Sequence, residues 1–419
     1  MWHLYGKQYD LTDFAKRHPG GSEIIKNTRG LSDCTALFES YHAFSDISGI
    51  LQSLNKYEAK LTDETTVPNR KFDDFSNYRE LVSRIKEKYP DRTYIKASSS
   101  WQIWTTIIAT AYCFLLGGIV STDYTLIKWA CSILGGVVEM SLLFNVLHDS
   151  SHYAITLDAD TNTRISKLAN GWALWNHIIW FYHHVYYHHS FTGGKDDTDE
   201  ELCKLTTPLN KLVPRHFEFA TNFIYVIFPG QHVSQIVWHV CNSLANQITF
   251  LKKKSVFIPT NDNRVSNLPV FNRIIKNANK NYNPYSICAM IMKLALLRSI
   301  GLPAGCLYLI GVNATYYINI IADHDLFETH KNHYDGPDWA KRQICNAGNF
   351  ATDNSFWTIM FGGINHQIEH HLFPNMCNHH YPEIAHIVRQ FCKEKGFPYS
   401  SQPTVFDAYK SVMKKMKSL

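Results

Sequence analysis

Histidine is frequent in this 419-residue chain, and its placement is clustered. There are 22 histidines, and seven of them fall between His148 and His189. A single histidine is usually a polar residue satisfied by its surroundings, but a cluster of this density needs a common explanation. Imidazole is the commonest metal ligand in proteins. The clustering therefore predicts a metal site.

Three short motifs carry the candidate ligands: HDSSH, HHVYYHH and QIEHH. Within each motif, two of these residues are three or four positions apart, and a further histidine can stand directly beside one of them. Residues three or four positions apart lie on the same face of a helix. The predicted ligands and catalytic residues are His148, His152, His184, His188, His189, Gln367, His370 and His371, with His324 as an added ligand and His183 as a competitor within the second motif.

The number of candidate ligands favours two metal ions. One zinc ion takes three or four protein ligands, whereas these motifs offer at least seven imidazole nitrogens. A shell rich in imidazole and poor in oxygen suits iron that reacts with O2. The remaining alternatives are a structural zinc site and histidines that merely lie at a membrane interface.

The third motif has a second interpretation. Read from His366, it is H-x-x-E-H, the zinc-ligand pattern of inverted zinc peptidases. Read from Gln367, it is Q-x-x-H-H, and His370 and His371 can then join the histidines of the other two motifs in one composite metal site. We adopt the second frame, which leaves Glu369 in a supporting role.

Long apolar segments adjoin the histidine motifs and are expected to cross a membrane. Residues 101–120 run without a charge, and 20 helical residues span about 30 Å, the thickness of a hydrocarbon core. Two of the other segments are weaker candidates for membrane spans, because each contains one charged residue, Glu139 or Lys293. Four spans are predicted at residues 101–120, 129–147, 285–297 and 303–322, and residues 223–240 are predicted to lie at the interface.

The four spans form two hairpins that return all histidine motifs to one side. Because both flanks of the first hairpin are basic and its turn has no Lys or Arg, that side is expected to be cytosolic. The ten cysteines form no C-x-x-C pair and fit a reducing compartment. A net charge of +5 gives little reason to expect nucleic-acid binding, and no cleaved signal peptide is evident.

The N-terminal region holds a second pair of candidate ligands. His18 opens the turn HPGG, and His42 follows 24 residues later. Two histidines on separate short helices can clamp a haem iron from both faces, and such a haem carries electrons because no coordination position stays open. The alternative is two surface histidines in a small α+β domain.

A charged stretch, residues 67–100, links the two regions. Tyr78, Leu81, Val82 and Ile85 follow steps of three and four, which predicts an amphipathic helix. Its apolar face is expected either to lie on a membrane surface or to belong to a solvated linker helix.

Two known families resemble this sequence. Residues 2–66, with WHLYGKQYDLTDFAKRHPGG, resemble the cytochrome b5 domain, which implies His18 and His42 as axial ligands of haem b. From residue 101 onward the chain resembles membrane fatty acid desaturases, whose three histidine boxes match HDSSH, HHVYYHHSFTG and QIEHH in order and spacing. A cytochrome b5 domain together with glutamine opening the third box is typical of front-end desaturases, and the first two boxes look Δ5-like.

The expected fold is mainly α. A small α+β haem domain (1–66) and a linker (67–100) precede a four-span helical membrane domain with a cytosolic helical cap (101–419).

The resemblance implies two non-haem irons and haem b as cofactors, with O2 and a long-chain unsaturated acyl-CoA or phospholipid as substrates. It further implies NADH–cytochrome b5 reductase as electron donor and the endoplasmic reticulum membrane as location, where Lys415 and Lys417 would form a dilysine retrieval signal. Alternatives are a sphingoid-base desaturase, a fatty acyl hydroxylase and, more distantly, an intramembrane zinc peptidase.

Overall fold

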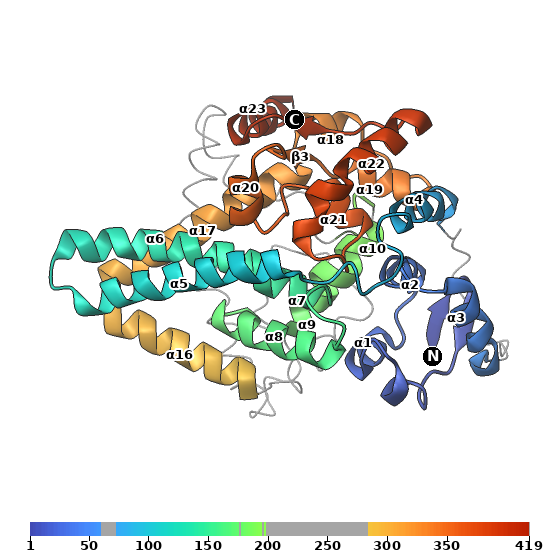
Figure 1. Cartoon of the computed structure of the whole chain (residues 1–419), viewed down its shortest axis with the longest axis horizontal. Coiled ribbons are helices and arrows are strands. Elements are labelled where there is room, and N and C mark those ends of the chain that lie inside the picture. The colour runs from blue at the N-terminus through green and yellow to red at the C-terminus, as the bar shows by residue number, and fades with distance from the viewer. Residues whose placement is uncertain (60–72, 176, 195–196, 198–283, 419) are drawn as a thin grey trace, which may run out of the picture.

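The computed structural model of the chain describes residues 1–59, 73–175, 177–194, 197 and 284–418 (Figure 1). The described residues are mainly helical, which confirms the expected fold class. Two short strand pairs accompany the helices: β1 (Trp2–Leu4) runs antiparallel to β2 (Lys7–Tyr9), and β3 (Asn349–Phe350) runs parallel to β4 (Ser401–Gln402). The interfacial segment expected at residues 223–240 lies outside the described residues.

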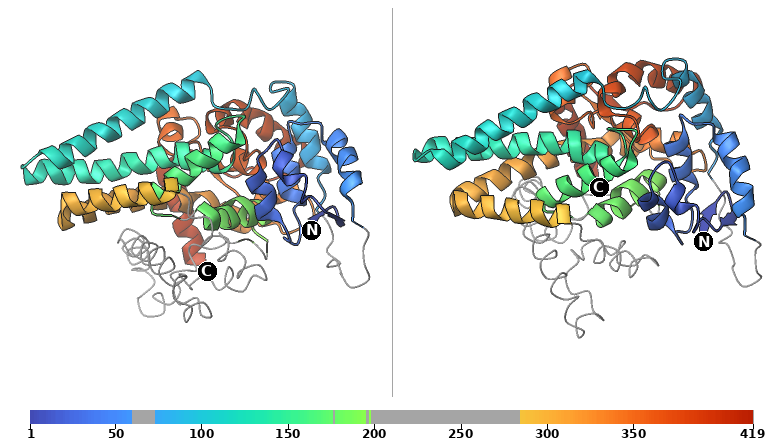
Figure 2. Two further views of the ribbon diagram at one scale, coloured as in Figure 1. Left: turned by 90° about the horizontal axis from the view of Figure 1, so that it is seen from below. Right: turned by 60° about the horizontal axis from the view of Figure 1, so that its bottom comes forward.

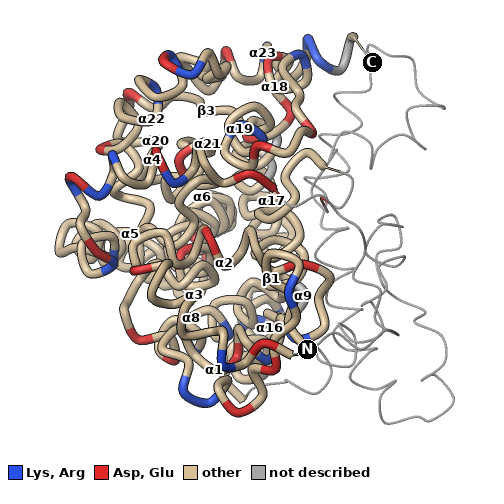
Figure 3. Tube along the Cα trace, turned by 90° about the vertical axis from the view of Figure 1, so that its right-hand side faces the viewer, with Lys and Arg blue, Asp and Glu red and all other residues tan. Residues whose placement is uncertain are grey.

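The N-terminal domain is a small α+β unit. Its helices are η1 (Ala15–Arg17), α1 (Ser22–Thr28), α2 (Thr35–His42), α3 (Ile47–Leu54) and η2 (Asn55–Tyr57). Asp46 caps α3 by accepting a hydrogen bond from the Gly49 amide. Strand and helix side chains such as Trp2, Leu4 and Leu37 share one buried core. Figure 3 looks onto this side of the molecule, where stretches with Lys or Arg and stretches with Asp or Glu are interspersed.

The linker helix α4 (Ser76–Lys86) has the predicted period, but a membrane does not cover its apolar face. Tyr78, Leu81, Val82 and Ile85 are all buried in a core shared with Trp339 and Phe373 of the C-terminal region. The interpretation of α4 as a membrane-surface helix is therefore wrong, because protein already covers the face that would enter the lipid.

Four helices correspond to the expected spans: α5 (Ser99–Ser121), α6 (Thr125–Leu143), α16 (Pro284–Ile300) and α17 (Leu302–His324). They extend together to one side of the molecule, away from the N-terminal domain (Figure 2). Within the described residues, three helical stretches are long and apolar enough to cross a membrane: Ser99–Ser121, Thr125–Ser151 and Leu302–Lys331. α16 has 17 residues, about 25 Å of helix, so the fourth span stays a prediction.

The two charges inside the apolar helices pair with each other. The ammonium group of Lys293 on α16 binds the carboxylate of Glu139 on α6, and both side chains are buried. Tyr112 and Trp172 also donate hydrogen bonds to this carboxylate, at 2.6 and 3.0 Å. A buried charge is tolerated when it is paired and hydrogen-bonded, so this network joins α16 to the other helices.

Helices α6 and α17 approach closely at two glycines. A Cβ atom on Gly136 would lie 2.0 Å from the carbonyl oxygen of Tyr308, and one on Gly311 would lie 2.2 Å from that of Ile133. Only glycine permits this backbone contact. The crossing fixes the relative position of the two helices: α17 ends at His324, and the π-helical turn that follows α6 ends at His148.

Short helices surround the histidine-bearing ends of the long ones. They are α7 (Asp149–Ser151), α8 (Ala159–Trp172), α9 (His177–Trp180), α18 (Phe327–Lys331), α19 (Trp339–Cys345), α20 (Ser355–Met360), η8 (Asn378–His380), α22 (Tyr381–Lys395) and α23 (Val405–Ser418). On α23, Lys415 is buried and its ammonium group lies 2.6 Å from Asp325. This burial does not fit the exposed retrieval signal proposed for Lys415.

Candidate metal centre

The fold brings together the three histidine motifs and His324, which come from four places in the chain. The first motif begins in η3 (Phe144–His148), and the second occupies η4 (Phe181–His188) and α10 (His189–Phe191). The third lies in α21 (Gln367–Leu372), and His324 ends α17. Both η3 and η4 are π-helical, whereas the sequence argument assumed ordinary α-helix. Such wide turns are frequent at functional sites.

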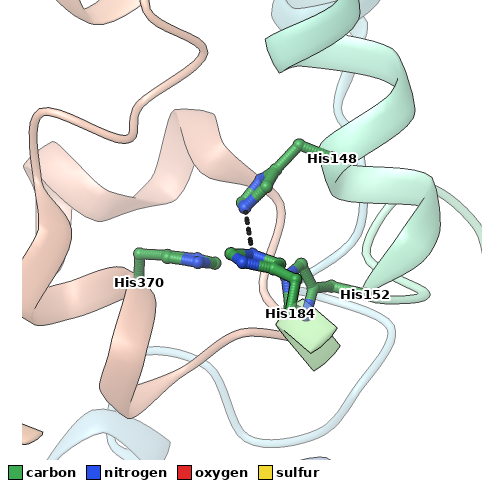
Figure 4. A group of neighbouring side chains, drawn as sticks. All are labelled: His148, His152, His184 and His370. Atoms are coloured by element: carbon green, nitrogen blue, oxygen red, sulfur yellow. Dashed lines mark hydrogen bonds between the residues drawn. The ribbon is translucent and has the colours of Figure 1, made fainter. Parts of the chain in front are cut away.

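One group of imidazoles contains His148, His152, His184 and His370 (Figure 4). Their candidate ligand atoms all lie within 4.8 Å of one another, and all four residues are buried. The Nε2 atoms of His148 and His184 are 3.1 Å apart. Four ring nitrogens that converge from three separate motifs form a pocket suited to one metal ion.

A second group contains His188, His324 and His371. The Nε2 atom of His324 lies 3.1 Å from that of His188 and 3.1 Å from that of His371. The side-chain amide of Gln367 approaches the same point, 2.9 Å from His324 Nε2 and 3.2 Å from His371 Nε2. This arrangement suits a second metal ion with three imidazoles and one amide beside it.

His189 lies between the two groups. Its Nε2 atom is 3.4 Å from that of His184. Its ring centroid is 4.6 Å from that of His370 and 4.5 Å from that of His371. The structure thus gathers every residue predicted from the three motifs, together with His324, at one place.

Most of the imidazoles are held through their other ring nitrogen. The Nδ1 atom of His188 lies 2.9 Å from Asp197, that of His324 lies 2.8 Å from the carbonyl oxygen of Asn346, and that of His371 lies 2.9 Å from Gln343. Two further contacts of this kind are His152 with Tyr41 and His370 with Tyr381. A second hydrogen bond of this kind fixes the tautomer and leaves Nε2 for metal.

Sequence reasoning missed these outer partners. Asp197 could have been found from the sequence, because it belongs to the acidic run that follows the second motif. Tyr41, Gln343, Asn346 and Tyr381 stand far from the boxes they support or in no recognisable pattern. Their roles follow only from the fold.

The donor set fits transition-metal ions. In the part of the chain that the structure describes, the Nε2 atoms of His152 and His370 are buried without a hydrogen-bond partner. Leaving such atoms unsatisfied is unfavourable, and metal coordination would satisfy both. The shell consists of imidazoles with no carboxylate in either group, which favours iron over the hard cations that prefer oxygen.

The alternative H-x-x-E-H reading of the third motif would make His366 a metal ligand, but His366 lies outside both imidazole groups. The Nδ1 atom of His366 lies 3.8 Å from Glu369. Glu369 accepts hydrogen bonds from Asn349 at 2.8 Å and Tyr399 at 2.9 Å, and burial raises its pKa to about 7. His183 is also outside both groups.

In the N-terminal domain, His18 and His42 face each other. Their ring centroids are 6.1 Å apart. The Nδ1 atoms bond to the carbonyl oxygens of Gly21, at 3.0 Å, and Phe38, at 2.9 Å, which leaves both Nε2 atoms free to ligate. Two metal–imidazole bonds of about 2 Å, with the rings themselves, span a gap of this size. Burial lowers the pKa of His42 to about 4, so the ring is in its neutral, ligating form.

The N-terminal domain packs directly on the second histidine motif. Tyr182 donates a hydrogen bond to the carbonyl oxygen of Asn27 at 2.7 Å, and Tyr186 donates one to that of Asp33 at 2.6 Å. Both tyrosines join the core of the N-terminal domain. The helix that carries the second motif is thus also a docking surface for this domain.

Comparison with known proteins gives two family matches. Residues 124–403 match the model of the fatty acid desaturase family, and residues 1–67 match that of the cytochrome b5-like heme/steroid binding domain.

Similar proteins extend over nearly the whole chain. An acyl-lipid (8-3)-desaturase of Mortierella alpina is 24% identical, with 99% of this chain and 93% of that protein covered. A protein of the same name from Physcomitrium patens is 25% identical, covering 99% and 87%. A probable Delta(5) fatty acid desaturase of Dictyostelium discoideum is 26% identical, covering 97% and 88%.

Proposed function

Because this chain belongs to the fatty acid desaturase family and carries an N-terminal cytochrome b5-like domain, we propose that it is a front-end desaturase of Δ5-like specificity. It is an oxidoreductase of membrane lipids. The proposed reaction forms a cis double bond between an existing double bond and the carboxyl end of a polyunsaturated acyl chain. The names of its relatives, which include an acyl-lipid (8-3)-desaturase and a Delta(5) desaturase, support this regiochemistry.

The observation that carries the proposal is the pair of imidazole groups, in which every ring except His324 is buried. We propose two non-haem irons, one held by His148, His152, His184 and His370 and the other by His188, His324 and His371, with His189 and Gln367 completing the shells. Bound iron would supply the oxidising power, from O2, that removal of hydrogen from an unactivated methylene requires. The protein orients these imidazoles and buries all of them except His324, which is partly exposed.

The proposed electron carrier is a haem b between His18 and His42. Since both axial positions would be taken by imidazole, such a haem transfers electrons and leaves O2 to the other site. Each desaturation with reduction of O2 to water needs two electrons from outside the substrate. We propose NADH–cytochrome b5 reductase as their source and the endoplasmic reticulum as the membrane, with the histidine motifs on its cytosolic side.

A row of aromatic rings in contact connects the apolar helices with the first metal group. The ring of Trp180 stacks on His184 with centroids 4.4 Å apart, and Trp175 stacks on Trp180 at 5.0 Å. Trp175 also contacts Tyr316 of α17. We propose that the acyl chain approaches the metal along these rings, since all three are only partly buried.

The relatives named as acyl-lipid desaturases favour a chain esterified to a membrane lipid over acyl-CoA. Expression in yeast fed single polyunsaturated acids tests the assignment. Mass spectrometry should locate a new double bond on the carboxyl side of the existing ones, and it should appear first in phospholipids.

Three other products would overturn parts of the proposal. A new double bond in sphingoid bases would assign a different substrate, and a hydroxylated acyl chain would assign a different reaction. A first appearance in the acyl-CoA pool would leave the reaction intact and change only the carrier.

A further inference from the structure

The end of α2 lies against the metal centre. Helix α2 ends at His42, and the residue before it, Tyr41, contacts a histidine of the first motif. The phenolic oxygen of Tyr41 is 2.7 Å from Nδ1 of His152, and the two rings are nearly parallel, at 29°. A residue covalently joined to one candidate iron ligand is thus hydrogen-bonded to a ligand of the other site.

The site determines the direction of this hydrogen bond. His152 belongs to the first metal group, and its Nε2 atom has no hydrogen-bond partner among the described residues. With Nε2 turned to metal, a neutral imidazole keeps its proton on Nδ1. His152 therefore donates the bond and the Tyr41 oxygen accepts it, which makes Tyr41 the outer partner that orients this ligand.

The surroundings hold Tyr41 in place. Asn375 donates a hydrogen bond to the Tyr41 carbonyl oxygen at 3.0 Å. Lys96 in turn donates to the carbonyl oxygens of Asn375 and Tyr153, both at 2.8 Å. Two residues past His42, Phe44 is buried against Phe373 of the desaturase part. Because the Tyr41 carbonyl group and the chain directly after it are anchored, the contact of Tyr41 with His152 is a built feature of the interface.

We infer that Tyr41 couples the two metal sites electronically, through its peptide bond to His42 on one side and its hydrogen bond to His152 on the other. This inference rests on the proposed function. With haem held by His18 and His42 and iron held by the histidine groups, each transfer would take one electron from ferrous haem iron, leaving it ferric, and would reduce one ferric iron at the histidine site to ferrous. No covalent bond forms or breaks, and Tyr41 keeps its proton.

The test removes only the hydroxyl group. Full-length Tyr41→Phe protein, loaded with haem and iron, is reduced with NADH and the reductase. Once NADH is exhausted, the protein is mixed with O2 and acyl substrate, and ferrous-haem absorbance is followed by stopped flow. We expect haem oxidation to slow about 10- to 100-fold, the usual effect of losing an outer partner of a metal-bound histidine. Haem reduction by the reductase should be unchanged.

Two reference variants make the result interpretable. Tyr182→Phe removes another phenol from the same interface, the one bonded to the Asn27 carbonyl oxygen, and should keep the wild-type rate. His370→Ala, expected to lose its non-haem iron, gives the rate of haem oxidation by O2 alone. Haem and iron contents measured on every sample separate slow transfer from metal loss.

Two outcomes would overturn the inference: a wild-type rate in Tyr41→Phe, or an equal slowing in Tyr182→Phe, which would assign the effect to docking in general. The proposed function fails differently. If wild-type protein binds iron but oxidises its haem no faster than His370→Ala, then the haem does not supply the metal centre at all.

Discussion

At the level of single residues, the metal centre depends on which nitrogen of each imidazole faces inward. Outer partners settle this for His188, His324 and His371, whose Nδ1 atoms are bonded to a carboxylate, a carbonyl and an amide oxygen. Neutral rings at fixed orientation are what transition-metal ions such as iron require from imidazole ligands. A single substitution at an inward nitrogen should therefore remove metal.

The two frames of the third motif differ in a measurable way. We expect His370→Ala to lose non-haem iron and all desaturation, because this residue closes the first group. His366→Ala should retain both, since that ring belongs to neither group. Elemental analysis and fatty acid profiles check the pair. Stoichiometric zinc in wild-type protein, or loss of metal in His366→Ala, would restore the peptidase frame.

Haem binding should depend on His18 and His42 alone among the histidines of the N-terminal domain. His18→Ala and His42→Ala are each expected to abolish the haem spectrum and cellular desaturation while non-haem iron stays bound. His3→Ala is the matched control: its ring bonds only to the Leu31 carbonyl oxygen among its described contacts, and it should keep haem. Desaturation that persists without haem would contradict the proposal that this haem passes electrons to the metal centre.

The residue types and spacings were sufficient to predict which imidazoles the fold gathers, because each motif is local in sequence. They were insufficient for Tyr41 and His152, which are 111 residues apart and meet only after two domains dock. Gln343 illustrates the same limit, since nothing in its neighbourhood marks a partner of His371. Contacts that depend on the arrangement of whole elements leave no local pattern.

At the level of elements, the apolar helices depend on a buried ion pair. Lys293→Met should leave the Glu139 carboxylate buried without its counter-charge and destabilise the protein by about 3–5 kcal/mol. The double variant Glu139→Gln, Lys293→Met should recover much of that loss, because neither charge remains. Thermal unfolding in detergent, followed by tryptophan fluorescence, checks both. Equal stability of the single and double variants would mean that the pair is not coupled.

Glu139 and Lys293 also show a limit of predicting membrane spans from hydropathy. Each charge alone weakens the case for a span, and only the fold reveals that one neutralises the other. Helix α4 gives the converse lesson. Its buried stripe was predicted from spacing alone, but the sequence could not tell whether lipid or α19 and α22 would cover that stripe.

At the level of the whole molecule, the N-terminal domain is docked by specific polar contacts as well as by apolar packing. Glu23 on α1 reaches Lys167 of α8 at 2.5 Å and His177 of α9 at 3.1 Å. Burial by itself would raise the pKa of Glu23, but the hydrogen bonds and charges of these two partners lower it to about 2. This carboxylate therefore favours the docked state over a wide pH range.

We predict that Glu23→Gln destabilises the docked domain by about 2 kcal/mol, the worth of a hydrogen bond to a charged group. Urea unfolding followed by the haem Soret band measures this, because docking stabilises the folded domain by linkage. Glu58→Gln is the matched control: it removes an exposed pair with Lys7 and should leave stability nearly unchanged.

The pH dependence of the same difference identifies its origin. Since folding lowers the pKa of Glu23 from its ordinary 4.5 to about 2, its contribution is fully present above pH 4.5 and is lost as the pH falls towards 2. The gap in stability between wild type and Glu23→Gln should accordingly shrink as the pH is lowered from about 5 to 3. A gap that stays constant across this range would show that the substitution acts through packing, not through the charge that holds the two domains together.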